Sequence, residues 1–504
     1  MCKDRKESIR SKFKLPSLLM NWISLLGLLT AAFAFITSGT LLVLDILSPF
    51  GTPYVGILTY MVGPGILAGG LGLTIVGALV QRARQRRAGS TAQGLPVIDL
   101  NNQKHLAYLM MTVAGGLVFI SLTAVGSYRA YHFTESVEFC GLTCHKVMEP
   151  EHTAFQNSPH ANVECTTCHI GPGAGWFVKA KLSGLRQVYN VAFNKYQRPI
   201  STPVHNLRPA RETCYMCHWP QKFFGSVLLQ RTYYRGNESN TPWTVQMLVK
   251  VGGGDREHGR AQGIHWHMAI QNKTEYIATD EKRLVIPWVR TTDANGRVTV
   301  FNTKDSKPAL KDEDIAKAEI RVMDCIDCHN RPSHQYRSPE RTMNEALASG
   351  RIDSSLSSIK AKACQALTGT YTNQADALAS IQKNLSEAYP GGGPRVEQAI
   401  ETVQMIYSEN FFPEMNVNWK QYPDHIGHMI TPGCFRCHDN EHVSDDGKVI
   451  SKDCNSCHTI IAQGPGTELA GTTSAGMEFE HPEDIGDEWK KSLCNDCHEG
   501  MPVQ

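Results

Sequence analysis

The sequence predicts a mainly α-helical chain that three transmembrane helices anchor in a membrane, followed by a loop-rich part with a small inserted β module. Three observations support this fold class. Three long apolar runs precede residue 128, seven related cysteine and histidine motifs lie between Cys140 and His498, and β-branched and aromatic residues gather between 225 and 303. The runs are typical of transmembrane helices, and the last group is typical of strands.

Each apolar run is long enough to cross a bilayer. The first extends from Leu18 to about Leu44 after six basic residues in Met1–Lys14, the second is the uncharged run Tyr54–Val80, and the third is Leu106–Ser127. At about 1.5 Å per residue, such helices reach across the roughly 30 Å of a hydrocarbon core. A cleaved signal peptide has a shorter apolar core and would leave two runs unexplained. We therefore expect a three-helix membrane anchor over residues 1–128.

Basic residues beside the runs predict the orientation, because Lys and Arg near a span stay in the cytoplasm. The loop Asp45–Pro53 holds none, whereas the N-terminus holds six and the loop between the second and third runs holds Arg82, Arg84, Arg86, Arg87 and Lys104. We expect a cytoplasmic N-terminus and an extracytoplasmic chain after Ser127.

Six motifs have the spacing Cys-x-x-Cys-His. Two thiols at this spacing can add to the two vinyl groups of a haem, and the histidine that follows reaches the iron as proximal ligand. A further motif, Cys140, Cys144 and His145, has one extra residue between its thiols, which a turn can accommodate. The sequence therefore predicts seven covalently attached haem c groups, the other six at Cys165/Cys168/His169, Cys214/Cys217/His218, Cys325/Cys328/His329, Cys434/Cys437/His438, Cys454/Cys457/His458 and Cys494/Cys497/His498.

The motifs use 14 of the 16 cysteines, so neither a disulfide framework nor zinc explains the cysteine count. Bacteria attach haem covalently in the periplasm, so we expect an inner-membrane protein with periplasmic haem domains. Residues 1–128 carry 11 Lys and Arg against 4 Asp and Glu, and the total net charge is +2, so the remaining chain has a net charge of −5. This acidic part argues against nucleic acid as a partner.

The outer part divides into three predicted regions. Residues 129–224 hold the first three motifs, 225–310 form a β-rich insert, and 311–504 hold the last four motifs with a helical segment over 338–410 that Ser338 caps. The predicted strands are Ser226–Tyr233, Trp243–Val251, Leu284–Arg290 and Arg297–Asn302, with a further strand that places His265 and His267 on one face.

A basic amphipathic helix is predicted after the second motif. Its apolar positions recur at helical spacing, and the residues that define the pattern are Val178, Leu182, Leu185, Val188 and Ala192, with Lys179, Lys181 and Arg186 between them. A helix of this kind next to a span is typical of the membrane interface. The same pattern fits an ordinary surface helix equally well.

An iron that only carries electrons has a second axial ligand, and histidine is the usual one. The best-placed histidines beside the motifs are His160, His205, His265, His267, His334, His428, His442 and His481. We expect two histidine ligands for most of the irons, with only one of His265 and His267 serving as a ligand.

The stretch from Leu106 to His218 resembles the NapC/NirT family of membrane-anchored cytochromes c. The resemblance rests on CxxxCHKVMEP after a membrane helix, on NSPHANVECTTCHIGPG, and on the lysine-containing helix that follows. It implies oxidation of quinol and transfer of electrons to periplasmic acceptors. The three spans, seven motifs and large extra domain are similar to the seven-haem inner-membrane cytochromes of metal-respiring bacteria, the ImcH type.

The chain departs from the family pattern at two places. Members often carry CHxM, whose methionine ligates the first haem, whereas Met148 stands three residues after His145. The quinol site of the family contains a lysine, which Lys179 or Lys181 matches, and an acidic residue that has no counterpart before Glu212. The proton acceptors then expected near the first haem are Glu149, Glu151 and His152.

Three functions fit the sequence. The first is oxidation of menaquinol or ubiquinol, followed by electron transfer through the haems to periplasmic c-type cytochromes. The second is reduction of a small oxyanion, which requires one iron with an open position. The third is an electron-relay subunit of a larger membrane complex, which requires no quinol site of its own.

Overall fold

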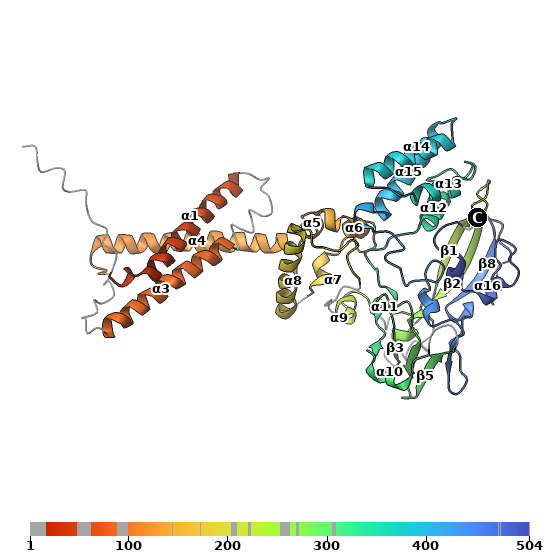
Figure 1. Cartoon of the computed structure of the whole chain (residues 1–504), viewed down its shortest axis with the longest axis horizontal. Helices are drawn as coiled ribbons and strands as arrows, with labels where there is room; N and C mark the ends of the chain where they lie inside the picture. The colour runs from red at the N-terminus through yellow and green to blue at the C-terminus, as the bar shows by residue number, and fades with distance from the viewer. Residues whose placement is uncertain are drawn as a thin grey trace, which may run out of the picture. The chain divides into compact units, whose positions relative to one another are not determined.

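The computed structural model describes residues 17–47, 62–87, 99–143, 145–171, 173–202, 209–219, 223–252, 263–268, 272–304, 309–471, 473 and 475–502. The chain divides into two compact units, Met1–Thr143 and Cys144–Gln504 (Figure 1). The boundary falls inside the first motif, so this motif is the covalent junction between the two units.

The first unit is helical. Its main helices are α1 (Trp22–Leu47), α3 (Gly63–Arg87) and α4 (Gln103–Glu135), and its short ones are η1 (Ser17–Leu19) and α5 (Val137–Leu142). Among the described residues, Trp22–Val43 and α3 are long and apolar enough to cross a membrane. The third predicted span lies inside α4, so its helical structure is confirmed while its crossing of the membrane stays a prediction.

Small residues bring α1 and α3 into close contact. A Cβ added at Gly70 would lie 2.7 Å from the backbone nitrogen of Ala31 and 2.9 Å from the carbonyl oxygen of Gly27. The side-chain amide of Asn21 also donates to the carbonyl of Gly77 across the pair, at 3.1 Å. Close backbone approach and such hydrogen bonds hold helices together in lipid, where no hydrophobic driving force acts between them.

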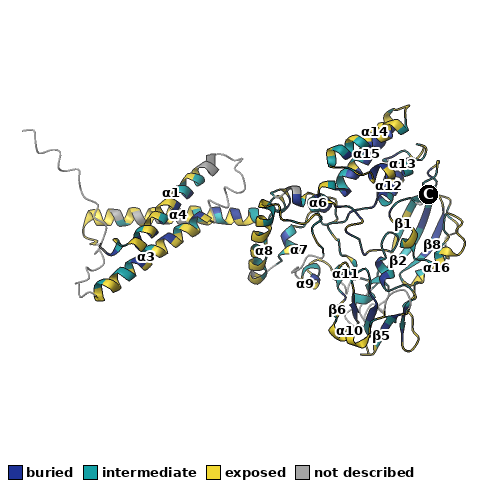
Figure 2. Ribbon diagram, in the orientation of Figure 1, coloured by how far each residue is buried: buried dark blue, intermediate teal, exposed yellow. Residues whose placement is uncertain are grey.

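The second unit begins with four helices, α6 (His145–Gln156), α7 (Cys165–His169), α8 (Ala174–Ala192) and α9 (Ala210–Cys214). α8 confirms the predicted amphipathic helix. Its apolar residues Val178, Leu182, Leu185 and Val188 are all more than half exposed (Figure 2).

Two antiparallel sheets combine strands from distant parts of the second unit. One has the order β1-β2-β8, with strands at Ser226–Tyr234, Pro242–Lys250 and His458–Pro465. The other has the order β6-β3-β4-β5-β7, with strands at Arg321–Val322, Lys273–Ile277, Trp288–Thr292, Val298–Thr303 and His442–Ser444.

Most predicted strands are confirmed, although the one expected at Leu284–Arg290 begins only at Trp288. The strands between 226 and 303 do not close on themselves into a separate module. Each sheet is completed by strands from Arg321 onward, so the inserted segment and the C-terminal haem region share their hydrogen bonds.

Four helices form a compact helical module, α12 (Pro339–Ala348), α13 (Ile359–Leu367), α14 (Gln374–Ala388) and α15 (Pro394–Asn410) (Figure 1). Ser338 caps α12 as predicted, because its hydroxyl oxygen accepts from the N–H of Arg341 at 3.3 Å. The module encloses a core of fully buried side chains such as Ile359, Ile381 and Val403 (Figure 2).

A buried lysine ties this module to the first sheet. Lys360, at the start of α13, donates to the carbonyl oxygen of Tyr234 in β1 and to the carboxylate of Glu340 at 3.1 Å. The pairing satisfies a charge that is almost entirely removed from water.

The remaining elements of the second unit are short, and several of them contain motif cysteines. They are η4 (Ile264–Met268), α10 (Asp312–Lys317), α11 (Cys325–Cys328), η5 (Pro413–Met415), η6 (Gly433–Arg436), η7 (Cys454–Ser456), α16 (Glu488–Lys491) and α17 (Cys494–Cys497).

Replacing Gly70 with leucine should destabilise the α1–α3 pair by about 1–3 kcal/mol, because the added side chain meets the facing backbone and cannot move away. Gly72→Leu is the matched control, since a Cβ there meets nothing within 4 Å. Thermal unfolding of the detergent-solubilised protein should show a lower midpoint for Gly70→Leu only. Equal midpoints for the two variants would contradict this packing.

Candidate functional site

The described motifs fold as single helical turns. In four of them the N–H of the histidine donates to the carbonyl of the first cysteine, at 2.8 Å for His218 and His329 and at 3.0 Å for His438 and His498. The second motif forms α7, and the sixth begins with η7. One turn places both thiols and the imidazole at neighbouring positions, as attachment to a single flat group requires.

In the part of the chain that the structure describes, six motif histidines each face a second histidine. Two imidazoles that bind one metal ion from opposite sides have ring centres roughly 6 Å apart, because each ring nitrogen lies about 2 Å from the metal. The observed centre-to-centre distances match this spacing: His169 to His334 6.2 Å, His218 to His160 6.1 Å, His329 to His265 6.4 Å, His438 to His267 6.0 Å, His458 to His428 6.2 Å, and His498 to His481 6.1 Å.

Backbone carbonyls orient most of the partner rings. Nδ1 donates to a carbonyl oxygen at 2.7 Å in His265, 3.0 Å in His267 and His334, and 3.2 Å in His160. A ring that donates through Nδ1 keeps the lone pair of Nε2 available for a metal. Burial also lowers the pKa of His267 to about 4, which favours the neutral imidazole that binds metals.

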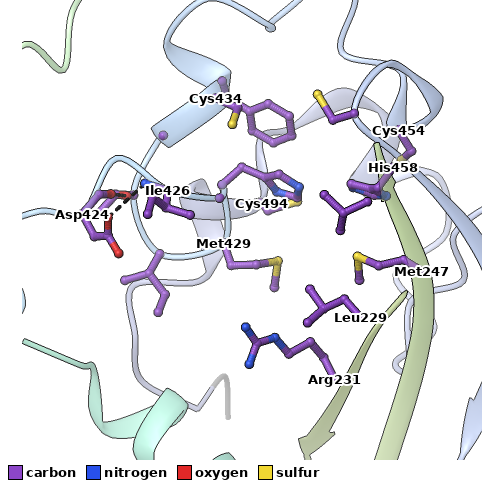
Figure 3. A pocket seen from close by; sticks show the side chains of 18 of the residues that line it. Leu229, Arg231, Met247, Asp424, Ile426, Met429, Cys434, Cys454, His458 and Cys494 are labelled. Carbon is purple, nitrogen blue, oxygen red and sulfur yellow. Dashed lines mark hydrogen bonds between the residues drawn. The ribbon is translucent and has the colours of Figure 1, made fainter. Parts of the chain in front are cut away.

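A single large cavity connects these sites. Its volume is about 2560 Å³, and cysteines of the third to seventh motifs and five of the six histidine pairs line it. Figure 3 shows Cys434, Cys454 and Cys494 around this space, with Leu229 and Met247 on the wall that β1 and β2 form. Protein interiors otherwise pack with few voids larger than a water molecule.

The second thiols of three motifs are more exposed than the first. Cys168, Cys217 and Cys497 are exposed, whereas the first cysteine of each of these motifs is half-buried. Cys214 lines the cavity but Cys217 does not. The reason is local: α9 ends at Cys214, and Cys217 lies in the turn that follows, where its side chain reaches the surface. Attachment of haem at Cys217 stays a prediction, and such a thioether would lie at the protein surface.

The residues around the cavity fit haem c. The volume is several times the roughly 300–1,000 Å³ of a pocket for one small molecule, and the wall combines apolar side chains with paired thiols. Bound haem c supplies one-electron redox chemistry, and two histidine ligands leave no position on an iron for a substrate. The arrangement therefore suits the transport of electrons.

A buried charged network joins the fourth and fifth motifs. The carboxylate of Asp327 accepts hydrogen bonds from Tyr276 at 2.8 Å, Arg283 at 3.1 Å and Arg321 at 2.7 Å. Its backbone carbonyl accepts from Arg436 of the fifth motif at 2.6 Å. The sequence does not predict this network, because the variable positions inside a motif, such as Asp327 and Arg436, carry no pattern of their own. Their partners Tyr276, Arg283 and Arg321 lie outside the motifs and meet them only in the fold.

The second to the fifth motifs lie next to one another in space in the order of the chain, and the sixth lies beside the seventh. α7 contacts α9, and α9 contacts α11, which brings the second, third and fourth motifs together. The network of Asp327 joins the fourth motif to the fifth. Lys452, two residues before the sixth motif, donates to the carbonyl of Ser492 beside the seventh at 3.3 Å.

The structure corrects the prediction for His265 and His267. They lie on the 3-10 helix η4 rather than on a strand, and each faces the proximal histidine of a different motif. Residues two apart share one face of a strand, but they point in different directions where each turn takes three residues. The turn therefore faces two sites, whereas the sequence analysis expected one.

His442 is also corrected. Its Nδ1 lies 2.8 Å from the carboxylate of Asp439 and its Nε2 lies 2.8 Å from the carbonyl oxygen of Ile286, so both ring nitrogens are engaged inside the protein. His205 lies outside the described residues.

The residues predicted around the first haem lie on α5, α6 and α8. Cys140 belongs to α5, α6 starts at His145, and Cys144 lies outside the described residues. Met148 is half-buried on α6, and its role as a ligand stays a prediction.

The predicted quinol-site residues occupy two helices of the second unit. Glu149 is exposed and His152 is half-buried on α6. On α8, the ammonium of Lys179 lies 4.7 Å over the ring of Trp176, and that of Lys181 lies 4.9 Å over the ring of Phe177.

Comparison with known proteins identifies related chains. Residues 101–204 match the NapC/NirT cytochrome c family, N-terminal region. The chain is 44% identical to the cytochrome c-type protein ImcH of Geobacter sulfurreducens over 494 residues, which cover 96% of each chain. It is 30% identical to the cytochrome c-type protein TorY of Haemophilus influenzae over 110 residues, 18% of this chain and 29% of that protein. No solved structure matches the chain.

Replacing either His265 or His267 with alanine should convert one low-spin haem to the high-spin form, and the double variant should convert two. Each ring faces a different proximal histidine, so the two losses should add. Electron paramagnetic resonance of the oxidised protein measures the high-spin fraction, with the exposed His105→Ala as control. A high-spin signal in only one of the two single variants would restore the original expectation.

Proposed function

The chain belongs to the family of the cytochrome c-type protein ImcH, and from this premise we propose that it oxidises quinol at the membrane and passes the electrons through seven haems to periplasmic c-type cytochromes. It is a membrane-anchored multihaem cytochrome c of the NapC/NirT type. We propose the quinol reaction, the count of seven haems and the periplasmic acceptor. We also propose that the protein lies in a bacterial inner membrane with a cytoplasmic N-terminus.

The observation that carries the proposal is the set of six facing histidine pairs. An oxyanion reductase needs at least one iron with an open position, whereas an electron carrier needs both axial positions filled. At each of these six sites a second ring stands where a substrate would bind. The pairs therefore favour electron transport over substrate reduction.

We place quinol oxidation beside the first motif, since its cysteines follow the third predicted span by about a dozen residues. Oxidation of a quinol to a quinone releases two electrons and two protons. Lys179 or Lys181 orients a quinol oxygen through its ammonium group, and Glu149 or His152 accepts the proton. Haems held by the motif cysteines and histidines would accept the electrons one at a time, and the protons would pass to the periplasm.

The surface of α8 supports a site at the bilayer. Val178, Leu182 and Leu185 form an exposed apolar stripe, and Lys179 and Arg186 lie beside it. An apolar stripe flanked by basic side chains is the pattern of a helix in the headgroup region, where lysine reaches outward to phosphate. A quinol that diffuses in the bilayer would meet these lysines at its edge. This favours direct quinol oxidation over a relay subunit without a quinol site.

The intact protein should carry seven haems, because the turn that contains Cys140 can accommodate the extra residue of the first motif. Mass spectrometry of the whole chain counts them directly. Cys140→Ala/Cys144→Ala should lose one haem, and Cys364→Ala, whose buried thiol lies in the helical module, should lose none. A wild-type mass with six haems, together with an unmodified Cys140 peptide, would show that no haem is attached at the first motif.

Substituting Lys179 and Lys181 together with glutamine should slow haem reduction by quinol about 10- to 100-fold, the effect of losing a charge-assisted hydrogen bond of roughly 1.5–3 kcal/mol. Glu149→Gln/His152→Gln should slow it at least about tenfold, because the proton acceptor is lost. Stopped-flow absorbance with a quinol analogue measures the rate, and dithionite should reduce all variants alike.

The matched control is Lys383→Gln, an exposed lysine on α14 far from the motifs in sequence. It should behave as wild type. Unchanged quinol rates in both double variants would move the quinol site elsewhere, most simply among the apolar helices.

A further inference from the structure

Glu151 connects the first motif to the histidine pair of the second. α6 begins at His145 of the first motif, and Glu151 lies six residues later on the same helix, about 9 Å along its axis. Its backbone carbonyl accepts a hydrogen bond from Nδ1 of His334 at 3.0 Å, and its carboxylate Oε2 lies 3.2 Å from the same nitrogen. His334 is the ring that faces His169.

The carboxylate is shielded from water and has a cation beside it. Its side chain is 15% exposed, and the nearest guanidinium nitrogen of Arg331, itself 10% exposed, lies 3.7 Å away. The guanidinium of Arg331 lies 3.8 Å over the ring of Tyr422. Burial, and then the charge of Glu151, raises the pKa of Tyr336 in the same cluster. Charges in such surroundings are screened weakly.

We propose that Glu151 is a positioning residue whose backbone carbonyl orients His334 and whose carboxylate lowers the reduction potential of the haem at the second motif. Oε2 of the carboxylate accepts no hydrogen bond from the ring, and its negative charge, 3.2 Å from Nδ1, would stabilise the more positive ferric iron through space. Arg331 acts in the opposite sense, because its positive charge offsets that of Glu151. This deepens the proposed function, on which it rests for the haem at the second motif.

The test is a mediated redox titration of the full-length protein without quinol, followed by absorbance and electron paramagnetic resonance. Glu151→Gln keeps the shape and removes the charge. It should shift the ferric–ferrous equilibrium of one haem towards the ferrous form at least about tenfold, a rise of about 59 mV for a one-electron couple. Glu387→Gln, an exposed carboxylate on α14, should leave every potential unchanged.

Two further variants separate charge from packing. Arg331→Gln should shift the same haem in the opposite direction, and Glu151→Asp should restore part of the wild-type value. The haem concerned is identified by His334→Ala, which should make that haem high-spin.

Shifts of equal sign in Glu151→Gln and Arg331→Gln would overturn the proposal, and so would a Glu151→Gln titration identical to that of Glu387→Gln. The measurement does not depend on quinol. If the potentials shift as expected while the wild-type protein fails to oxidise quinol, the proposed function falls and the role of Glu151 stands.

Discussion

The second unit depends on one geometric constraint. In each histidine pair, two imidazole rings must face each other with their centres about 6 Å apart, the spacing of two rings that bind one metal ion from opposite sides. One ring comes from a motif turn and the other from a different segment, as His458 in β8 and His428 before η6 illustrate. Five of these pairs line a cavity of about 2560 Å³, far larger than the voids of a close-packed protein core. Haem attachment and folding of this unit are therefore coupled, as metal binding and folding are in small metalloproteins.

The helical module of α12 to α15 is stabilised in a different way. Its core consists of buried aliphatic and aromatic side chains, and Lys360 joins it to β1 through bonds that satisfy its charge. The chain thus combines two kinds of stabilisation, by side-chain packing in the module and by bridging groups around the cavity. The two sheets connect these parts of the chain, because each sheet contains strands from both the inserted segment and the C-terminal part.

The sequence predicted those features whose signal is local. α8, the cap at Ser338 and most strands follow from spacing and residue type, and the structure confirms them. The comparisons confirm that the chain is a c-type cytochrome, and haem attachment at each motif stays a prediction. The pairing of rings could not be predicted, since it depends on which distant segments meet. His442 resembled a ligand because it stands near a motif, yet the fold directs its nitrogens to Asp439 and Ile286. The conformation around His267 could not be predicted either. The same residues fit a strand, and only the structure shows that Gly263 turns the backbone at φ +85°.

The position of His334 has a consequence for how the protein is made. In five of the six pairs the partner histidine precedes its motif in the chain, so both rings have already been synthesised when the motif emerges. The second motif is the exception, because His334 follows it after the third and fourth motifs. A haem attached at Cys165 and Cys168 while the chain is being made would therefore lack its proposed second ligand, His334, until the fourth motif has been translated. The histidine pairs would thus be completed in an order that differs from the order of the motifs along the chain. A chain truncated before residue 334 would lack the second histidine of the second site.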